Sequence, residues 1–324
     1  MTSPWNHVAA GTKDASYLPV LKRADGTSLQ LPLLIVRGAC PGKTLLATAC
    51  VHGDEFEGPA ALWRLFEELK PSELRGTFVA VPLVNPPAYE AGLRVNPDDR
   101  QDLARVFPGN PAGTATEQIA HCLSEQLFPC VDFYLDLHSA GQYYMMPPLV
   151  GYQLRQEPLL GAQRAAAKAV GLPLMWGTPG LPGRSLSAAA ERGVPSLYVE
   201  ITGEGRCLPE DVAIYTNVLR RLLAHLGIVA SAPPADPPRW LVEDSGPQAG
   251  FLQVQNRAPL GGFFEAHVSV LAHVEAGQDV GVIRDPLGKV IHVVKSPHQG
   301  LVVFLRTFPR VQPGDPLCTV LELK

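Results

Sequence analysis

Short apolar runs alternate with longer amphipathic segments between about residue 31 and residue 228. Apolar runs bounded by turn residues predict buried strands, whereas apolar positions that recur with the helical period predict helices. We expect strands at residues 31–36, 45–51, 77–84, 131–137, 172–175 and 196–201. We expect helices at residues 59–69, 116–128, 159–170, 185–191 and 209–226. This order predicts an α/β fold, with a mostly parallel mixed sheet flanked by helices on both faces.

A proline-rich segment, Ser-Ala-Pro-Pro-Ala-Asp-Pro-Pro at residues 231–238, interrupts this pattern and predicts a stiff linker. Beyond it, short β-type runs alternate with turns that contain Gly or Pro. These runs are residues 262–267, 280–283, 290–295, 301–305 and 317–323. We therefore expect a first domain over residues 1–230, a linker over 231–240, and a small all-β domain over 241–324.

Two stretches of the first domain, residues 85–113 and 177–184, fit neither period and hold many Pro, Gly, Asp and Arg residues. Long irregular segments inside a compact domain are usually functional or disordered. Each follows a predicted strand, so we expect them to form the walls of a ligand site.

Composition excludes several classes of partner. Hydrophobic residues make up 46% and charged residues 18% of the 324 residues, as in an ordinary globular protein. The net charge of −4 and the lack of a basic cluster argue against a nucleic-acid partner. No apolar run approaches the ~18 residues of a membrane span, and the N-terminus lacks a signal-peptide pattern. Six scattered cysteines without a C-x-x-C pair predict free thiols in a cytoplasmic protein, and base rates predict a homo-oligomer.

The candidate chemistry lies where predicted strands end. His52 and Glu55 follow the run at 45–51, and His138 follows the run at 131–137. Ligand sites of open α/β sheets form beyond the carboxyl ends of the strands. Two imidazoles and one carboxylate at one such edge predict a site for a single zinc ion, with one position left open, as catalysis requires. Nitrogen and oxygen ligands also accept Co²⁺ or Mn²⁺; Cys50, two residues before His52, is interpreted as a small buried core residue.

Five ordered motifs carry a resemblance to a known family. They are His-Gly-Asp-Glu-Phe-Glu-Gly at residues 52–58, Val-Asn-Pro at 84–86, Asp-Leu-Ala-Arg-Val-Phe-Pro-Gly at 102–109, Asp-Leu-His-Ser at 136–139 and Val-Glu at 199–200. Over about residues 40–324 the chain resembles the succinylglutamate desuccinylase/aspartoacylase family, a branch of the zinc carboxypeptidase superfamily. The resemblance implies that His52, Glu55 and His138 are the zinc ligands.

The resemblance also implies the remaining roles. Glu200 matches the family's catalytic glutamate, a general base that would take a proton from water and return it to the leaving amine. Arg94 resembles the arginine that stabilises the carbonyl oxygen of the substrate, with Arg100 as a rival because the spacing to Arg105 is long. Arg105 resembles the arginine that grips the substrate carboxylate, and Asn85 is assigned to substrate binding.

One position departs from the family pattern. Ala104 stands where the family usually has Asn, immediately before Arg105. A lost amide removes one or two hydrogen bonds to the substrate carboxylate, so the identity of the substrate is less constrained than the zinc chemistry. The sequence predicts a zinc-dependent hydrolase of N-acyl amino acids or related small amides. The alternatives are a zinc carboxypeptidase that acts on peptide C-termini and a non-catalytic metal-binding regulatory protein.

Overall fold

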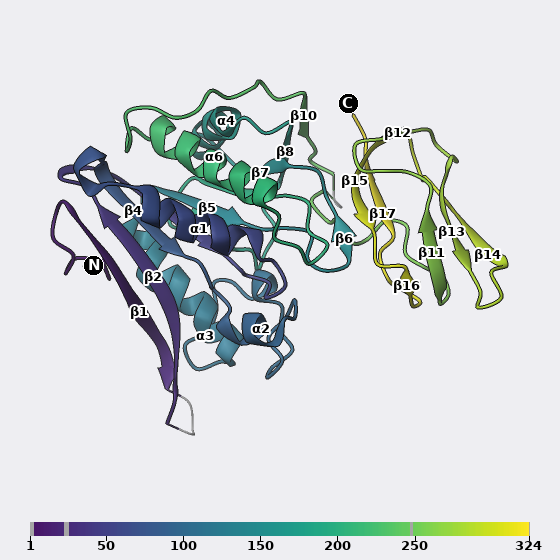
Figure 1. Ribbon diagram of the computed structural model, residues 1–324, viewed down its shortest axis with the longest axis horizontal. Coiled ribbons are helices and arrows are strands. Elements are labelled where there is room, and N and C mark those ends of the chain that lie inside the picture. Colours follow the sequence, from purple (N-terminus) through teal and green to yellow (C-terminus); the bar gives the residue numbers. More distant parts are fainter. Residues whose placement is uncertain (1–2, 23–25, 247–248, 324) are drawn as a thin grey trace.

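A nine-stranded mixed sheet forms the centre of the computed structural model, which describes residues 3–22, 26–246 and 249–323 (Figure 1). Its strand order is β1-β2-β4-β3-β5-β9-β7-β8-β10. The strands are β1 (Thr12–Lys22), β2 (Ser28–Arg37), β3 (Cys40–Ala49), β4 (Arg75–Val81), β5 (Phe133–Leu137), β7 (Leu149–Leu154), β8 (Leu174–Pro179), β9 (Ser196–Glu200) and β10 (Trp240–Glu243). Five of the eight neighbouring pairs are parallel, which confirms the predicted mostly parallel mixed sheet.

Helices cover both faces of this sheet. One face packs against α1 (Glu57–Glu68), α4 (Leu159–Val170) and α6 (Pro209–His225), and the other against α3 (Ala115–Cys122) and α5 (Ser185–Glu191). Alternation along β3 separates the two cores, because Leu45 and Ala47 face the first group of helices while Leu46 faces the second. The five predicted helices are therefore present, although the one expected at 116–128 continues beyond α3 as a π-helical turn (Leu123–Leu127) and a 3-10 turn (Phe128–Cys130).

Several elements did not follow from the sequence pattern. β1 is an edge strand, paired only with β2 among the described strands, and half of its side chains face solvent, so it lacks an apolar run. β7 was also not expected. The segment 85–113 contains the short helix α2 (Pro86–Ala91) and the 3-10 turn η2 (Leu103–Arg105), and a further 3-10 turn, η1 (Pro71–Glu73), precedes β4.

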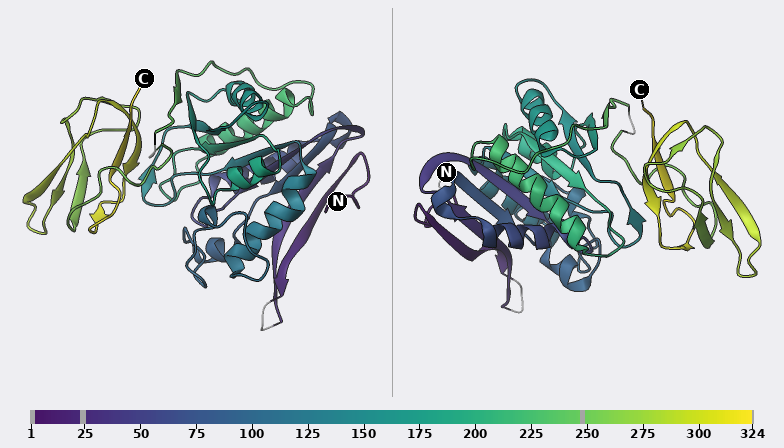
Figure 2. Two further views of the ribbon diagram at one scale, coloured as in Figure 1. Left: turned by 180° about the vertical axis from the view of Figure 1, so that it is seen from behind. Right: turned by 45° about the horizontal axis from the view of Figure 1, so that its top comes forward.

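The C-terminal module holds two small antiparallel sheets. Its strands are β11 (Gly262–Ala266), β12 (His273–Val274), β13 (Asp279–Arg284), β14 (Val290–Lys295), β15 (Gly300–Arg306), β16 (Arg310–Val311) and β17 (Cys318–Leu321), so each of the five expected runs forms a strand. The module and the β1–β2 hairpin lie at opposite ends of the molecule (Figures 1 and 2).

Two strands connect this module to the large domain. β10, which comes directly after the proline-rich segment, pairs with β8 and so extends the large sheet rather than the module. The two-residue strand β6 (Tyr144–Met145) of the first domain pairs with β15 of the module. The last residue of the linker expected at 231–240, Trp240, is therefore the first residue of a strand that belongs to the large sheet.

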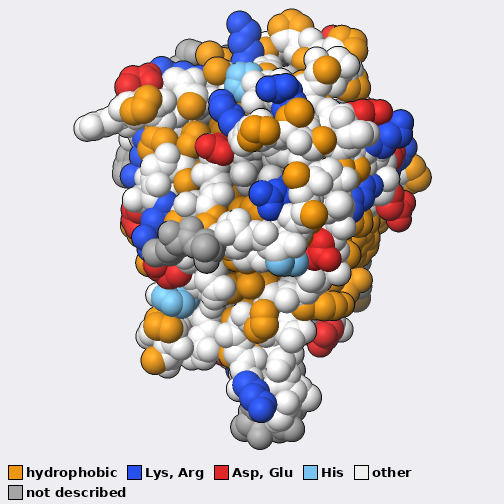
Figure 3. All heavy atoms as spheres, turned by 90° about the vertical axis from the view of Figure 1, so that its left-hand side faces the viewer, with side chains coloured by type: hydrophobic (Ala, Val, Ile, Leu, Met, Phe, Trp, Pro, Cys, Tyr) orange, Lys and Arg blue, Asp and Glu red, His pale blue; other side chains and the backbone are white. Residues whose placement is uncertain are grey.

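The described surface on the side of the β1–β2 hairpin mixes charges of both signs with apolar side chains (Figure 3). None of the described helices combines the length and the apolar character needed to span a bilayer. All six cysteines are free of disulfides, as predicted, and Cys50 is fully buried.

Candidate active site

The register of three parallel strands brings the candidate residues together. Ala49 of β3 lies beside Leu137 of β5, and Leu137 lies beside Val199 of β9. The carboxyl ends of these strands therefore lie at one edge of the sheet. His52 and Glu55 follow β3, His138 follows β5, and Glu200 is the last residue of β9.

The turn that carries His52 requires a glycine. A Cβ atom on Gly53 would lie 2.0 Å from the carbonyl carbon of Ala88 in α2, closer than any side chain can approach. This contact presses the turn after β3 against α2 and leaves His52 and Glu55 on the other side, where both are buried. The Gly of the His-Gly-Asp-Glu motif is thus explained by packing.

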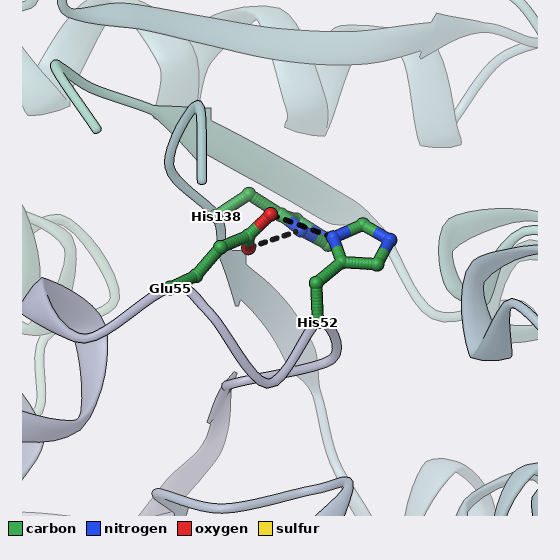
Figure 4. A group of neighbouring side chains, drawn as sticks. All are labelled: His52, Glu55 and His138. Atoms are coloured by element: carbon green, nitrogen blue, oxygen red, sulfur yellow. Dashed lines mark hydrogen bonds and ion pairs between the residues drawn. The ribbon is translucent and has the colours of Figure 1, made fainter. Parts of the chain in front are cut away.

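The carboxylate of Glu55 contacts both imidazoles, as the dashed lines in Figure 4 show. His52 Nδ1 is 2.6 Å from Glu55 Oε1, and His138 Nδ1 is 3.0 Å from Glu55 Oε2. One ligand atom from each residue lies within 4.8 Å of the others. The structure therefore brings the three predicted metal ligands together.

Each histidine has a second carboxylate on its far side. His52 Nε2 is 3.2 Å from Asp102 Oδ1, and His138 Nε2 is 3.3 Å from Asp136 Oδ2. Asp136 is itself held by the hydroxyls of Thr48, at 2.7 Å, and Ser185, at 2.5 Å. Such outer carboxylates favour the tautomer with the proton on Nε2, which leaves the Nδ1 lone pair free for a metal.

This donor set fits a divalent cation of the zinc type. Two nitrogen donors and one carboxylate match a catalytic zinc centre with an open position. Burial would raise the pKa of Glu55, but its electrostatic interactions and hydrogen bonds with His52 and His138 outweigh burial and hold its pKa below the usual range. Glu55 is thus available as an anionic ligand. Neither Asp102 nor Asp136 was predicted as a partner of the histidines.

Glu200 faces the same cavity as the three ligands. Burial raises the pKa of Glu200 to about 8, and the negative charge of Glu55 adds to this effect while His138 opposes it. A carboxylate with a raised pKa is a better proton acceptor near neutral pH than an ordinary one. Glu204, four residues further along the chain, does not line the cavity and forms an ion pair with Arg206.

The cavity has a volume of about 290 Å³ and is bounded by both parts of the chain. The predicted wall at residues 177–184 contributes Thr178, Pro179, Leu181 and Arg184, and the segment 85–113 contributes Arg94, Ala104 and Arg105. The C-terminal region contributes residues 250–254, Arg257 and Phe304 to the lining. The two irregular stretches are thus walls of the cavity, as expected.

Three arginines of the large domain line this cavity. Arg94 lies 3.4 Å from Asp102 Oδ2 and 3.9 Å from Glu55 Oε1, whereas its rival Arg100 is exposed and outside the lining. Arg105 lies 4.0 Å from Asp102 Oδ2, and 40% of its side chain is exposed. Arg184 was not predicted, and among the described residues its guanidinium has no hydrogen bond or ion pair.

The environment of Arg184 is unfavourable for a cation. Burial lowers the pKa of Arg184 to about 10, and the neighbouring positive charge of Arg105 contributes to this shift. A half-buried guanidinium that forms no ion pair with the described residues is available to pair with an anion that enters the cavity.

Ala104, which departs from the family pattern, and Asn85, which is predicted to bind substrate, differ in their position relative to the cavity. Ala104 lines the cavity, so a side chain at this position borders the space in front of Arg105. Asn85, by contrast, is fully buried outside the lining, and its amide donates to the carbonyl of Val51 at 3.2 Å. Asn85 thus holds the turn that carries His52, and its contact with substrate stays a prediction.

Comparison with known proteins identifies the family of this chain. The model of the succinylglutamate desuccinylase/aspartoacylase catalytic domain matches residues 41–226. The chain belongs to the succinylglutamate desuccinylase/aspartoacylase family. It is 30% identical over 305 residues to N-alpha-acetyl-L-2,4-diaminobutyric acid deacetylase of Halomonas elongata, covering 91% of this chain and 86% of that protein. The names of the family and of this relative are those of deacylases, which supports an amide-hydrolysing enzyme.

Solved structures of this family share the whole architecture. A succinylglutamate desuccinylase/aspartoacylase from Rhodobacter sphaeroides has a TM-score of 0.86 and 29% identity, covering 96% of each chain. The product-bound ectoine utilization protein EutE (DoeB) from Ruegeria pomeroyi also has a TM-score of 0.86 and 29% identity, covering 95% of this chain and 94% of that chain. Matches of this extent include the C-terminal module, so the module is part of the shared fold.

Proposed function

We propose that this chain is a zinc-dependent deacylase that hydrolyses the amide bond of N-acyl amino acids, with one zinc ion held by His52, Glu55 and His138. The observation that carries the proposal is the convergence of this donor set and the carboxylate of Glu200 on one cavity. When bound, the ion would supply Lewis acidity, lowering the pKa of a water molecule and polarising the amide carbonyl.

Glu200 acts as the general base and acid. It accepts a proton from the attacking water and delivers it to the nitrogen of the leaving amine. Its raised pKa suits both steps, because the carboxyl group can hold the proton between them.

Arg94 supports the negative charge that develops on the carbonyl oxygen. Asp102 and Glu55 hold its guanidinium at the cavity from two sides. A cation whose position is fixed before the reaction stabilises developing charge without a cost of reorganisation.

Arg105 and Arg184 bind the anionic part of the substrate. Arg105 is anchored by the carbonyl of Ala104 at 2.9 Å, and Arg184 lies close enough to Arg105 to depress its own pKa. A substrate carboxylate between them would neutralise a repulsive pair and replace the contact that Ala104 does not provide. The remaining carboxylates of the lining, Glu55 and Asp136, are occupied by the histidines.

The cavity supports deacylation better than peptidase action. Residues 250–254 and Phe304 contribute to its lining, and its volume of about 290 Å³ suits a small molecule. A peptide C-terminus would need an open cleft. A purely regulatory metal site, the other alternative, does not account for Glu200 and Arg94 in the same cavity.

The test measures hydrolysis of N-acetyl-L-aspartate, N-succinyl-L-glutamate, Nα-acetyl-L-2,4-diaminobutyrate and a tripeptide with a free C-terminus, each with and without chelator. We expect hydrolysis of at least one N-acyl amino acid, loss of activity with chelator, and no cleavage of the tripeptide. Because Arg184 lines the cavity and forms no ion pair with the described residues, the diaminobutyrate derivative should be a poorer substrate than an anionic one. Cleavage of the tripeptide alone would favour the carboxypeptidase, and no cleavage at all would favour a regulatory protein.

A further inference from the structure

A buried arginine connects the C-terminal module to the large domain. Arg306, the last residue of β15, is only 4% exposed. Its Nε donates to the carbonyl of Phe308 at 2.9 Å, and its Nη2 donates to the carbonyl of Arg310 at 2.6 Å and pairs with Asp315 at 3.2 Å. These contacts within the module fix the guanidinium, since a buried charge must be paired and hydrogen-bonded.

The same guanidinium reaches across to β6. Its Nη1 donates to the hydroxyl of Tyr144 at 3.1 Å, and it lies over the rings of Tyr143 and Tyr144 at 5.7 and 5.5 Å. Phe304 stacks on Tyr144 with ring centroids 4.4 Å apart. The backbone of β6 pairs with that of β15, with Tyr144 opposite Arg306. The two strands lie side by side at the junction of the large domain and the module (Figure 1). Arg306 therefore holds β6 onto the module through side chain and backbone together.

β6 in turn holds the segment that follows Glu200. The amide of Met146 donates to the carbonyl of Thr202 at 3.1 Å, and the amide of Glu204 donates to the carbonyl of Tyr144 at 3.1 Å. Gly203 sits at φ +92, where a Cβ would lie 2.6 Å from the Cβ of Ala140, so the segment has little room to shift. A continuous set of contacts thus runs from Arg306 through β6 to the residues directly after Glu200.

We propose that Arg306 is a positioning residue for Glu200, and that through it the C-terminal module is an integral part of the catalytic apparatus. The proposal rests on the role of Glu200 in the proposed function. Arg306 does not line the cavity and does not touch substrate. Its effect is to hold β6, so that the carboxylate at the end of β9 stays in the geometry that proton transfer requires.

The size of the effect follows from positional precision. A misplacement of ~1 Å can lower a rate ~10²-fold. The segment after Glu200 is also held on its other side, where the amide of Ala140 donates to the carbonyl of Ile201 at 3.2 Å. Loss of the Arg306 contacts should therefore loosen Glu200 only partly and lower kcat ~10-fold.

The first experiment measures hydrogen exchange in the full-length protein. In Arg306→Met, the amides of residues 144–146 and 203–205 should exchange ~10-fold faster or more than in the parent protein. The matched control is Arg284→Met, which removes another arginine of the module that pairs with Glu265 at 2.7 Å and has no contact with β6. If the amides of residues 144–146 and 203–205 exchanged at the same rate in Arg306→Met and Arg284→Met, the proposal would be overturned, whatever the activity of the two variants.

The second experiment is a double-mutant cycle between residues 306 and 200. Kinetics are measured with whichever of N-acetyl-L-aspartate, N-succinyl-L-glutamate and Nα-acetyl-L-2,4-diaminobutyrate is cleaved fastest. Arg306→Met should lower kcat ~10-fold when residue 200 is Glu, but less than ~2-fold in a Glu200→Gln background, where no base remains to be positioned. An equal loss in both backgrounds would show that Arg306 is merely structural.

Milder variants keep the test decisive if Arg306→Met does not fold. Tyr144→Phe removes only the hydroxyl that Arg306 contacts, and Arg306→Lys keeps the charge but loses the forked geometry. Both should retain one metal ion per chain and show the same dependence on Glu200, with a smaller loss of kcat. Normal kcat in both would overturn the proposal, whereas normal kcat in Glu200→Gln alone would overturn the proposed function instead.

Discussion

Asp102 is the residue whose replacement tests the architecture of the site most sharply, because it contacts three functional groups. Its Oδ1 is 3.2 Å from His52 Nε2 and accepts from the amide of Ala104 at 2.9 Å. Its Oδ2 lies 3.4 Å from Arg94 and 4.0 Å from Arg105. In Asp102→Asn the amide oxygen can keep the contacts of Oδ1, so the NH₂ group must replace Oδ2 and face the two guanidiniums.

Two separate losses follow from this exchange. The hydrogen bond from His52 changes from a charged acceptor to a neutral one, a difference of ~1–1.5 kcal/mol, so zinc affinity should fall ~5- to 12-fold. This loss overlaps only the lower limit of the ~10- to 100-fold range for outer partners of metal ligands. Arg94 and Arg105 also lose their common carboxylate, so kcat/KM should fall at least ~10-fold even when the site is saturated with zinc.

The assay is competition for zinc against a chelator of known affinity, followed by kinetics at saturating zinc. Asp99→Asn is the matched control, because Asp99 lies in the same segment but accepts from Thr116 and Gln101, and contacts none of the site residues. The reasoning would be refuted if Asp102→Asn bound zinc and turned over substrate like the control.

Three further results are expected. His52→Ala and His138→Ala should each abolish metal binding by elemental analysis, and normal metal content in both would remove the ligand assignment. Glu200→Gln should keep metal and fold but lose ~10²–10⁴ in kcat, and near-normal turnover would assign the base to another group. Ala104→Asn should raise kcat/KM ~2- to 150-fold for a substrate with a free α-carboxylate, which corresponds to ~0.5–3 kcal/mol. The same variant should change kcat/KM little when that carboxylate is blocked as an amide. Lower activity on every carboxylate substrate would show that Ala104 makes room for a bulkier group.

The central strands and the metal ligands could be predicted because both depend on local sequence. Residues 45–49 of β3, all residues of β5 and most residues of β9 are buried, and most of these buried residues are apolar. His52, His138 and Glu200 stand at or just after the ends of these strands. Parallel neighbours bring such ends to one edge, so the site followed from the strand assignment.

The remaining features depend on contacts between distant segments. The pairing of Asp102 with His52 and the approach of Arg184 to Arg105 require the tertiary structure, because each joins residues on separate loops. β10 follows a linker-like segment, and its place in the large sheet depends on its pairing with β8. The edge strand β1 alternates between faces and contains Pro19, a pattern that gives little signal for a strand.

The most direct test of the central claim is titration of zinc into chelator-stripped protein while hydrolysis of the best N-acyl amino acid is followed. We predict that stripped protein is inactive and that activity rises linearly until one zinc ion is bound per chain. His138→Ala should not recover under the same conditions. Full activity of the stripped protein, or recovery of His138→Ala at one equivalent of zinc, would contradict the account.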